Sequence, residues 1–193
     1  LDGSLISSRK TGSFLYIVAN KGVDSYLVRE KAEGILPTYR DTLLKDEFID
    51  IDYDKIYYFP DMAECSYLLI AALNLGSSEE PVNVSAYLGA GQNIYVSQKS
   101  MYVALTSDSP PQTVAEVDVK VQDTVDSVRK DVITIMPRVH ELRTLVYKFA
   151  LSGDSVTYVS KGEVPGTILN QFSMDEYDEK FRIATTEEGV WKN

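Results

Sequence analysis

Short apolar runs, separated by turns rich in Gly, Ser, Asp and Pro, occupy most of this chain. Runs of this length, rich in Val, Ile, Tyr and Phe, are typical of β-strands. We predict strands at 5–8, 14–19, 49–54, 67–75, 82–88, 93–97, 100–106, 144–151, 155–161, 169–173 and 181–186. The chain is therefore expected to be mainly β.

One four-residue scheme occurs three times, each time after a polar turn and a run that ends in serine. Its members are a large apolar residue, Tyr or Arg, Ile or Val, and a small apolar residue. The copies are Leu15–Val18, Met101–Ala104 and Phe181–Ala184, whose starts lie 86 and 80 residues apart. A hairpin repeated at such a distance indicates a fold built from repeated units.

Short strands in groups of four, joined by Gly-, Ser- and Asp-rich turns, favour the blades of a β-propeller over a sandwich. We expect one propeller-type domain over 1–193. Within it we assign a half blade with an irregular connection (1–60), a blade (61–107), an insertion (108–143) and a second blade (144–193). The predicted fold class is mainly β, a partial β-propeller of four-stranded antiparallel blades with an inserted helical or irregular segment.

The insertion has two competing patterns. Val117, Val121, Val125 and Val128 follow a spacing near 3.6 residues, which predicts an amphipathic helix over Asp118–Asp131. The many β-branched residues favour a strand instead. So does the alternation of Val117, Val119 and Val121 with polar residues. Both conformations remain open.

The net charge of the chain excludes some classes of binding partner. With 29 acidic against 19 basic residues the net charge is −10, which repels nucleic-acid phosphates and anionic membrane surfaces. No apolar run approaches the roughly 20 residues that cross a bilayer. A signal-peptide pattern is also absent, and we expect the chain to be part of a longer precursor. We predict no nucleic-acid binding and no membrane insertion.

An acidic stretch close to the C-terminus is the candidate functional surface. It comprises Asp175, Glu176, Tyr177 and Asp178, with Glu179 beside them. Paired carboxylates perform acid/base chemistry in glycosidases of propeller fold, but those carboxylates come from different blades. The alternative is a solvated turn in which Asp175 caps backbone amides.

The sequence gives little support for a metal site. Asp50, Asp52 and Asp54 alternate as in a calcium loop, but Lys55 replaces the glycine at the sixth position and Asp61 the glutamate at the twelfth. We interpret them as the solvated face of a strand, and predict no metal and no cofactor.

Three further residue classes have ordinary explanations. His140 and Cys65 are the only residues of their types, which excludes His-pair metal sites and an internal disulfide. Tyrosines such as Tyr57, Tyr58 and Tyr102 could form a carbohydrate-stacking surface, or pack across strands.

Several longer segments allow a comparison with a known family. They include DGSLISSRK at 2–10, LYIVAN at 15–20, LPTYRD at 36–41, YLGAGQNIYVS at 87–97, and VPGTILNQFSMDEY at 164–177, followed by FRIATTEEGVW. Over essentially its whole length the chain resembles secreted bacterial and archaeal proteins with a C-terminal β-propeller domain, which is distantly similar to WD-type propellers. The resemblance implies an extracellular or cell-envelope location and a longer complete propeller. It supplies no catalytic residue.

These observations favour a non-catalytic extracellular module that scaffolds or binds a macromolecule, either protein or carbohydrate. The alternative is part of a carbohydrate-active hydrolase with carboxylates facing the propeller channel. Incomplete rings leave blade faces open, so we also expect a homodimer through the faces around Leu15 and Ile17 and around Phe181 and Ile183, unless the irregular segments cover them.

Overall fold

The computed structural model describes residues 1–30, 34–58, 66–77, 79–109 and 141–187. Its strands are β1 (Ser4–Thr11), β2 (Phe14–Gly22), β3 (Thr38–Tyr39), β4 (Ile49–Asp50), β5 (Ile56–Tyr58), β6 (Ser66–Asn74), β7 (Asn83–Leu88), β8 (Asn93–Val96), β9 (Ser100–Ser109), β10 (Glu141–Ser152), β11 (Ser155–Pro165), β12 (Met174–Tyr177) and β13 (Lys180–Ile183). The helical elements are α1 (Ser25–Glu30) and two 3-10 turns, η1 (Tyr53–Lys55) and η2 (Gln171–Ser173).

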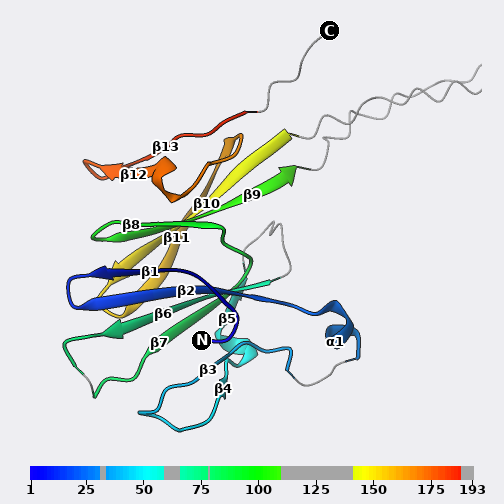
Figure 1. Cartoon of the computed structure of the whole chain (residues 1–193), viewed down its shortest axis with the longest axis vertical. Coiled ribbons are helices and arrows are strands. Elements are labelled where there is room, and N and C mark those ends of the chain that lie inside the picture. The colour runs from blue at the N-terminus through cyan, green and yellow to red at the C-terminus, as the bar shows by residue number, and fades with distance from the viewer. Residues whose placement is uncertain (31–33, 59–65, 78, 110–140, 188–193) are drawn as a thin grey trace, which may run out of the picture.

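Two large sheets and one hairpin form successive layers (Figure 1). The first sheet has the order β1-β2-β6-β7-β5, in which only β5 runs parallel to its neighbour. The second has the order β8-β9-β10-β11 and is antiparallel throughout. The β12–β13 hairpin, here called the third hairpin, follows. Sheets of four antiparallel strands stacked in chain order are the blades of a partial β-propeller.

The grouping of strands into blades differs from the prediction. We expected 67–106 to form one sheet and 144–186 the next. Instead β6 and β7 complete the sheet that β1 and β2 begin, and β8 and β9 pair with β10 and β11. Each repeated hairpin therefore begins a blade, and the assigned half blade (1–60) and blades (61–107 and 144–193) are out of phase by two strands. The predicted insertion now separates two neighbouring strands of one blade.

The repeated scheme encodes the stacking. Along β9, Met101 and Val103 face the first sheet, whereas Tyr102 and Ala104 face the third hairpin. Both sets are buried, because a blade has a neighbour on each side and needs two apolar faces. The four positions of the scheme therefore alternate between the preceding and the following layer.

The main core lies between the two sheets. Leu68, Ile70 and Tyr87 of the first sheet meet Tyr147 and Phe149 of the second, and all five are almost fully buried. Burial of each large apolar side chain stabilises the fold by about 1.5–3 kcal/mol. Aromatic edge contacts add to this, since the Tyr87 and Phe149 ring centroids lie 5.0 Å apart with the rings at 69°.

Residues 36–58 are here called the cover segment. Residues 36–55 lie against the back face of the first sheet, which is the face away from the second sheet, and β5 then joins the edge of that sheet (Figure 1). Tyr39, Ile51 and Ile56 from this segment pack on Leu69 and Ala86. Lys21 anchors the segment, because its ammonium donates to the Leu36 carbonyl at 2.8 Å and pairs with Asp2 at 2.5 Å. One of the two irregular segments thus acts as a cover.

Several local predictions need correction. The strand expected at 5–8 continues to Thr11, which pairs with Phe14, so that Gly12 and Ser13 make the first turn. The strand expected at 49–54 ends after Asp50, and η1 follows. Residues 169–173 are not a strand, because the Asn170 side chain accepts a hydrogen bond from the Phe172 amide and begins η2.

The alternative conformations considered for 118–131 lie outside the described residues. Among the described helices, none is long and apolar enough to span a bilayer.

Candidate functional site

The acidic stretch forms most of the third hairpin. Asp175, Glu176 and Tyr177 belong to β12, and Asp178 with Glu179 makes the two-residue turn to β13. Both turn residues have positive φ, 52° and 59°, which is the conformation of a type I′ hairpin turn. The structure brings the predicted residues together, but in a strand and its turn rather than in a solvated turn alone.

Glu176 connects the third hairpin to the second sheet. Its carboxylate accepts hydrogen bonds from the Tyr102 hydroxyl at 2.8 Å and from the Ser97 hydroxyl at 3.0 Å. Its backbone N–H donates to the Tyr95 hydroxyl at 3.1 Å. Burial raises the pKa of Tyr102, and the bond to Glu176 raises it further. This carboxylate therefore holds two layers together.

The other candidate residues differ in exposure. Asp175 forms an ion pair with Arg182 across the hairpin, and the Arg182 guanidinium lies 5.2 Å from the Tyr177 ring centroid. Tyr177 and Asp178 are exposed. The outer face of the hairpin thus carries a charge pair beside one exposed aromatic ring, and this arrangement suits contact with a partner better than acid/base chemistry.

The partners of Glu176 were not recognised from the sequence as parts of this site. Tyr95, Ser97 and Tyr102 lie 74 to 81 residues before it in the chain. The signal that was available is the repeat itself, because Ser97 ends the run before the second copy and Tyr102 is its second member.

The three alternating aspartates do not form a loop around one ion. Asp50 is exposed in β4, Asp52 pairs with Lys55 at 3.6 Å, and Asp54 lies in η1. In the described ranges no three His, Cys, Asp or Glu residues are grouped as metal ligands. Asp61, Cys65 and His140 lie outside those ranges, so the absence of a metal site stays a prediction.

The tyrosines divide into two groups. Tyr95 and Tyr102 pack between the second sheet and the third hairpin, where the Tyr102 ring stacks on Phe181 at 4.1 Å. Tyr57 and Tyr58 on β5 are exposed, although Tyr57 also stacks on Tyr87 at 5.4 Å. Cross-strand packing therefore explains the first pair, and only the second pair is available to a ligand.

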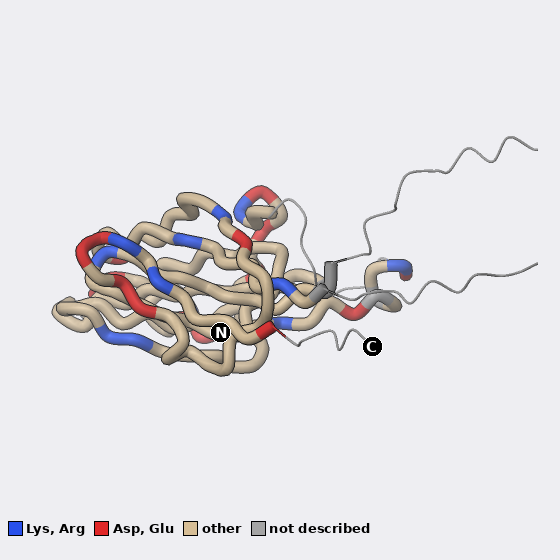
Figure 2. The backbone as a smooth tube through the Cα atoms, turned by 90° about the horizontal axis from the view of Figure 1, so that it is seen from above, with Lys and Arg blue, Asp and Glu red and all other residues tan. Residues whose placement is uncertain are grey.

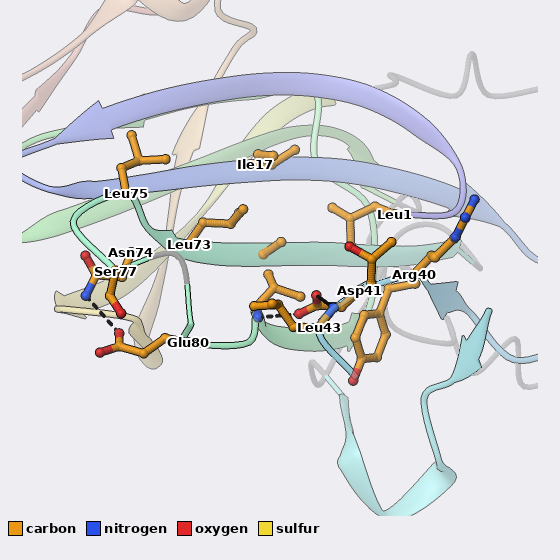
Figure 3. Close-up of a pocket in the computed structure, with 14 residues that line it drawn as sticks. Leu1, Ile17, Arg40, Asp41, Leu43, Leu73, Asn74, Leu75, Ser77 and Glu80 are labelled. Atoms are coloured by element: carbon orange, nitrogen blue, oxygen red, sulfur yellow. Dashed lines mark hydrogen bonds between the residues drawn. The ribbon is translucent and has the colours of Figure 1, made fainter. Parts of the chain in front are cut away.

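A cavity of about 710 Å³ lies between the cover segment and the back face of the first sheet (Figure 3). We call it the back cavity. Ile17, Leu73 and Val82 line its sheet side, and residues 39–43 line the opposite side. Its volume is in the range of small-molecule sites.

Polar groups of the back cavity are already engaged with the protein. The Asp41 carboxylate accepts from the Val82 amide at 2.7 Å and from the Leu43 amide at 2.9 Å. The Asn74 side chain donates to Glu80 at 2.8 Å, as drawn in Figure 3. The cavity therefore offers mainly apolar contact, and its two carboxylates have structural roles.

Exposed large apolar side chains concentrate on the cover segment. They are Leu43, Leu44, Phe48, Tyr53, Tyr57 and Tyr58, each between 53% and 69% exposed. We call this group the cover surface. Figure 2 shows acidic and basic residues interspersed over the described chain, without one face of a single sign. Contacts by these apolar side chains are therefore the stronger basis for recognition.

Comparison with known proteins supports the fold. No curated protein and no solved structure matches this chain significantly. A family model described as "Beta propeller domain" matches residues 1–193. The four-stranded antiparallel sheets and their face-to-face stacking agree with this match. The chain therefore belongs to the beta propeller domain family.

Proposed function

We propose that this chain is a non-catalytic binding module of an extracellular or cell-envelope protein, and that it holds a macromolecular partner on the cover surface. The observation that carries the proposal is the concentration of six exposed large apolar side chains between positions 43 and 58. Large apolar side chains exposed this densely along one segment often belong to a binding surface.

The position of the cover surface in the fold supports the proposal. It lies in the connection between β2 and β6, the second and third strands of the first blade. Insertions in repeat proteins lie on one face of the stack, which is often the binding face. A rigid sheet beneath a variable connection is the usual way in which a fold presents a binding loop.

The engagement of three carboxylates at the candidate sites also supports binding over hydrolysis. Glu176 and Asp41 accept two hydrogen bonds each from the protein, and Asp175 is paired with Arg182. Exposed tyrosine rings can stack on sugars as well as pack on proteins, so carbohydrate and protein are both suitable partners.

A site-specific photo-crosslinker tests the proposal. The crosslinking amino acid replaces Tyr53 in the protein within the cells that produce it, and replaces Tyr26, an exposed tyrosine outside the cover surface, as the matched control. We expect a discrete adduct, protein or polysaccharide, from position 53 and none from position 26. Equal labelling at both positions, or no adduct at position 53, would overturn the proposal.

A further inference from the structure

Residues Asn83, Val84 and Ser85 form the acceptor motif for N-linked glycosylation, which is an asparagine two positions before a serine with a residue other than proline between them. The sequence contains this motif once. Three residues match such a pattern by chance in many chains, so the structural setting of Asn83 decides whether a saccharide fits there.

Asn83 has the exposure that an acceptor needs. It is the first residue of β7 and is exposed, and so are Glu79, Glu80 and Pro81 just before it. It belongs to none of the apolar clusters, whereas its neighbour Val84 packs on the back of the first sheet. A bulky saccharide on the Asn83 amide therefore displaces no core side chain.

The Asn83 side chain has no hydrogen bond to lose. Asn20 and Asn170 bond to backbone groups of nearby loops, and Asn74 donates to Glu80. Within the described chain, by contrast, the Asn83 amide makes no hydrogen bond. Replacing one of its amide protons by a saccharide therefore costs no internal contact.

The outer edge of β7 is where a saccharide on Asn83 would lie. β5 pairs with residues 86–88 and leaves 83–85 without a described neighbour strand on that side. An unpaired edge invites pairing with another chain unless a bulky or charged group covers it. Further blades stack on the faces of a sheet rather than on its outer edge, so they do not supply this cover. A hydrophilic saccharide would supply it.

Ser85 determines when the saccharide is attached. It pairs with Ile70 of β6 and is half-buried in the folded sheet. An enzyme that recognises the serine hydroxyl needs this segment in an open conformation, which the segment has only before β7 pairs with β6. Attachment therefore precedes closure of the first sheet.

We propose that Asn83 carries an N-linked saccharide, transferred from a lipid-linked donor during export; this rests on the extracellular or cell-envelope location proposed above. The Asn83 Nδ2 forms a bond to C1 of the saccharide. The bond from C1 to the phosphate oxygen of the donor breaks, and the lipid phosphate leaves with the bonding electron pair. The amide gives up one proton to a basic group of the transferase.

Mass spectrometry of the protein purified from the cells that produce it tests the proposal. We expect an added saccharide mass that fragmentation locates at Asn83. Ser85→Ala should abolish it, and Ser85→Thr, which keeps the hydroxyl, should retain it. The matched control is Asn93→Gln, which should leave the saccharide in place because Tyr95 stands two positions after Asn93. An unmodified Asn83, or equal modification of the Ser85→Ala variant, would overturn the proposal.

Cell fractionation separates failure of this proposal from failure of the proposed location. Exported protein with an unmodified Asn83 contradicts the saccharide alone. Unmodified protein retained in the cytosol contradicts both the saccharide and the location.

A peptide with the sequence of residues 79–88 tests the order of attachment and folding. Incubated with membranes of the same cells, the peptide should be modified at Asn83, and its Ser85→Ala version should not. The folded protein, purified without the saccharide from a host that lacks the transferase, should stay unmodified under the same conditions. An unmodified native peptide would contradict recognition of this segment, and equal modification of peptide and folded protein would contradict attachment before the sheet closes.

Discussion

The Tyr102 hydroxyl donates a 2.8 Å hydrogen bond to the carboxylate of Glu176, 74 residues further along the chain. The bond joins the second strand of one blade to the first strand of the next. The ring of the same tyrosine stacks on Phe181. One side chain therefore contributes both apolar and polar contact to the junction between layers.

Tyr102→Phe keeps the stacking but removes the donor. We expect it to lower the free energy of unfolding by about 1–2 kcal/mol, because the Glu176 carboxylate loses one of its two protein donors. Chemical denaturation measures this. Tyr177→Phe, at an exposed position on the same hairpin, should cost less than about 0.5 kcal/mol. Equal losses would mean that the bond contributes nothing specific.

Gly91 is a second junction, between the two sheets. A Cβ at this position would lie 2.5 Å from a Val103 side-chain carbon and 3.2 Å from Leu68. Gly91→Ala should therefore destabilise the fold by about 1–3 kcal/mol through overpacking.

The control is Gly22→Ala, where the added Cβ meets nothing within 4 Å. Thermal unfolding of both variants provides the comparison, and an equal midpoint for the two would show that the Gly91 site can relax.

Acidic pH should weaken the ion pair of Asp2 with Lys21, which anchors the cover segment. Partial burial on its own raises the pKa of Asp2, but the hydrogen bond and charge of Lys21 outweigh it, and the pKa lies below its usual value of 3.8. A lowered pKa stabilises the fold above about pH 4, and this stability is lost as pH falls through the native pKa.

Asp2→Asn should therefore cost about 0.5–1 kcal/mol at pH 7 and nothing below the native pKa. Denaturation of both proteins across this pH range measures the difference. A difference that stays constant down to the lowest pH would contradict an electrostatic role for Asp2.

Alkaline pH should destabilise the fold through ionisation of Tyr87. Burial raises its pKa from 10.0 to about 12. A raised pKa means that the contribution of the neutral phenol is complete below pH 10.0 and is lost as pH rises towards 12.

Over that pH interval the free energy of unfolding of Tyr87→Phe should fall less than that of the native protein. In an ultraviolet titration, the variant should lack the one tyrosine that ionises near pH 12. Retention of that late titration in the variant would assign it to another tyrosine.

The backbone strain in the turn of the third hairpin can be removed by a glycine. Glu179 has φ 59°, a conformation that costs a side-chain-bearing residue about 1 kcal/mol more than glycine. Glu179→Gly should stabilise the protein by about 0.5 kcal/mol after the entropy of the unfolded chain is included. Asp154→Gly, in a turn where Gly153 already supplies the positive φ, should destabilise it instead. Calorimetry of the two variants distinguishes these signs.

The candidate site was only partly visible in the sequence. Asp175 and Glu176 are recognisable as neighbouring carboxylates, but nothing local distinguishes a solvated Glu176 from one bonded to Tyr102 and Ser97. The distinction depends on contacts across more than 70 residues. Of the cover surface, only Tyr57 and Tyr58 were considered from the sequence. The other members were missed for the same reason, because exposure of a residue such as Phe48 depends on how the segment meets the sheet.

Sequence alone determined the strands of the two large sheets other than β5, and the repeat, because alternation of apolar residues and Gly- or Asp-containing turns are local properties. It could not determine which strands share a sheet. Central strands such as β6 and β9 are buried on both faces, so their apolar pattern suits either grouping. Tertiary structure decided the phase of the blades, through the pairing of Leu15 with Leu73 and of Met101 with Phe149 across long connections. Such pairings depend on backbone hydrogen bonds and complementary faces that exist only once distant segments meet.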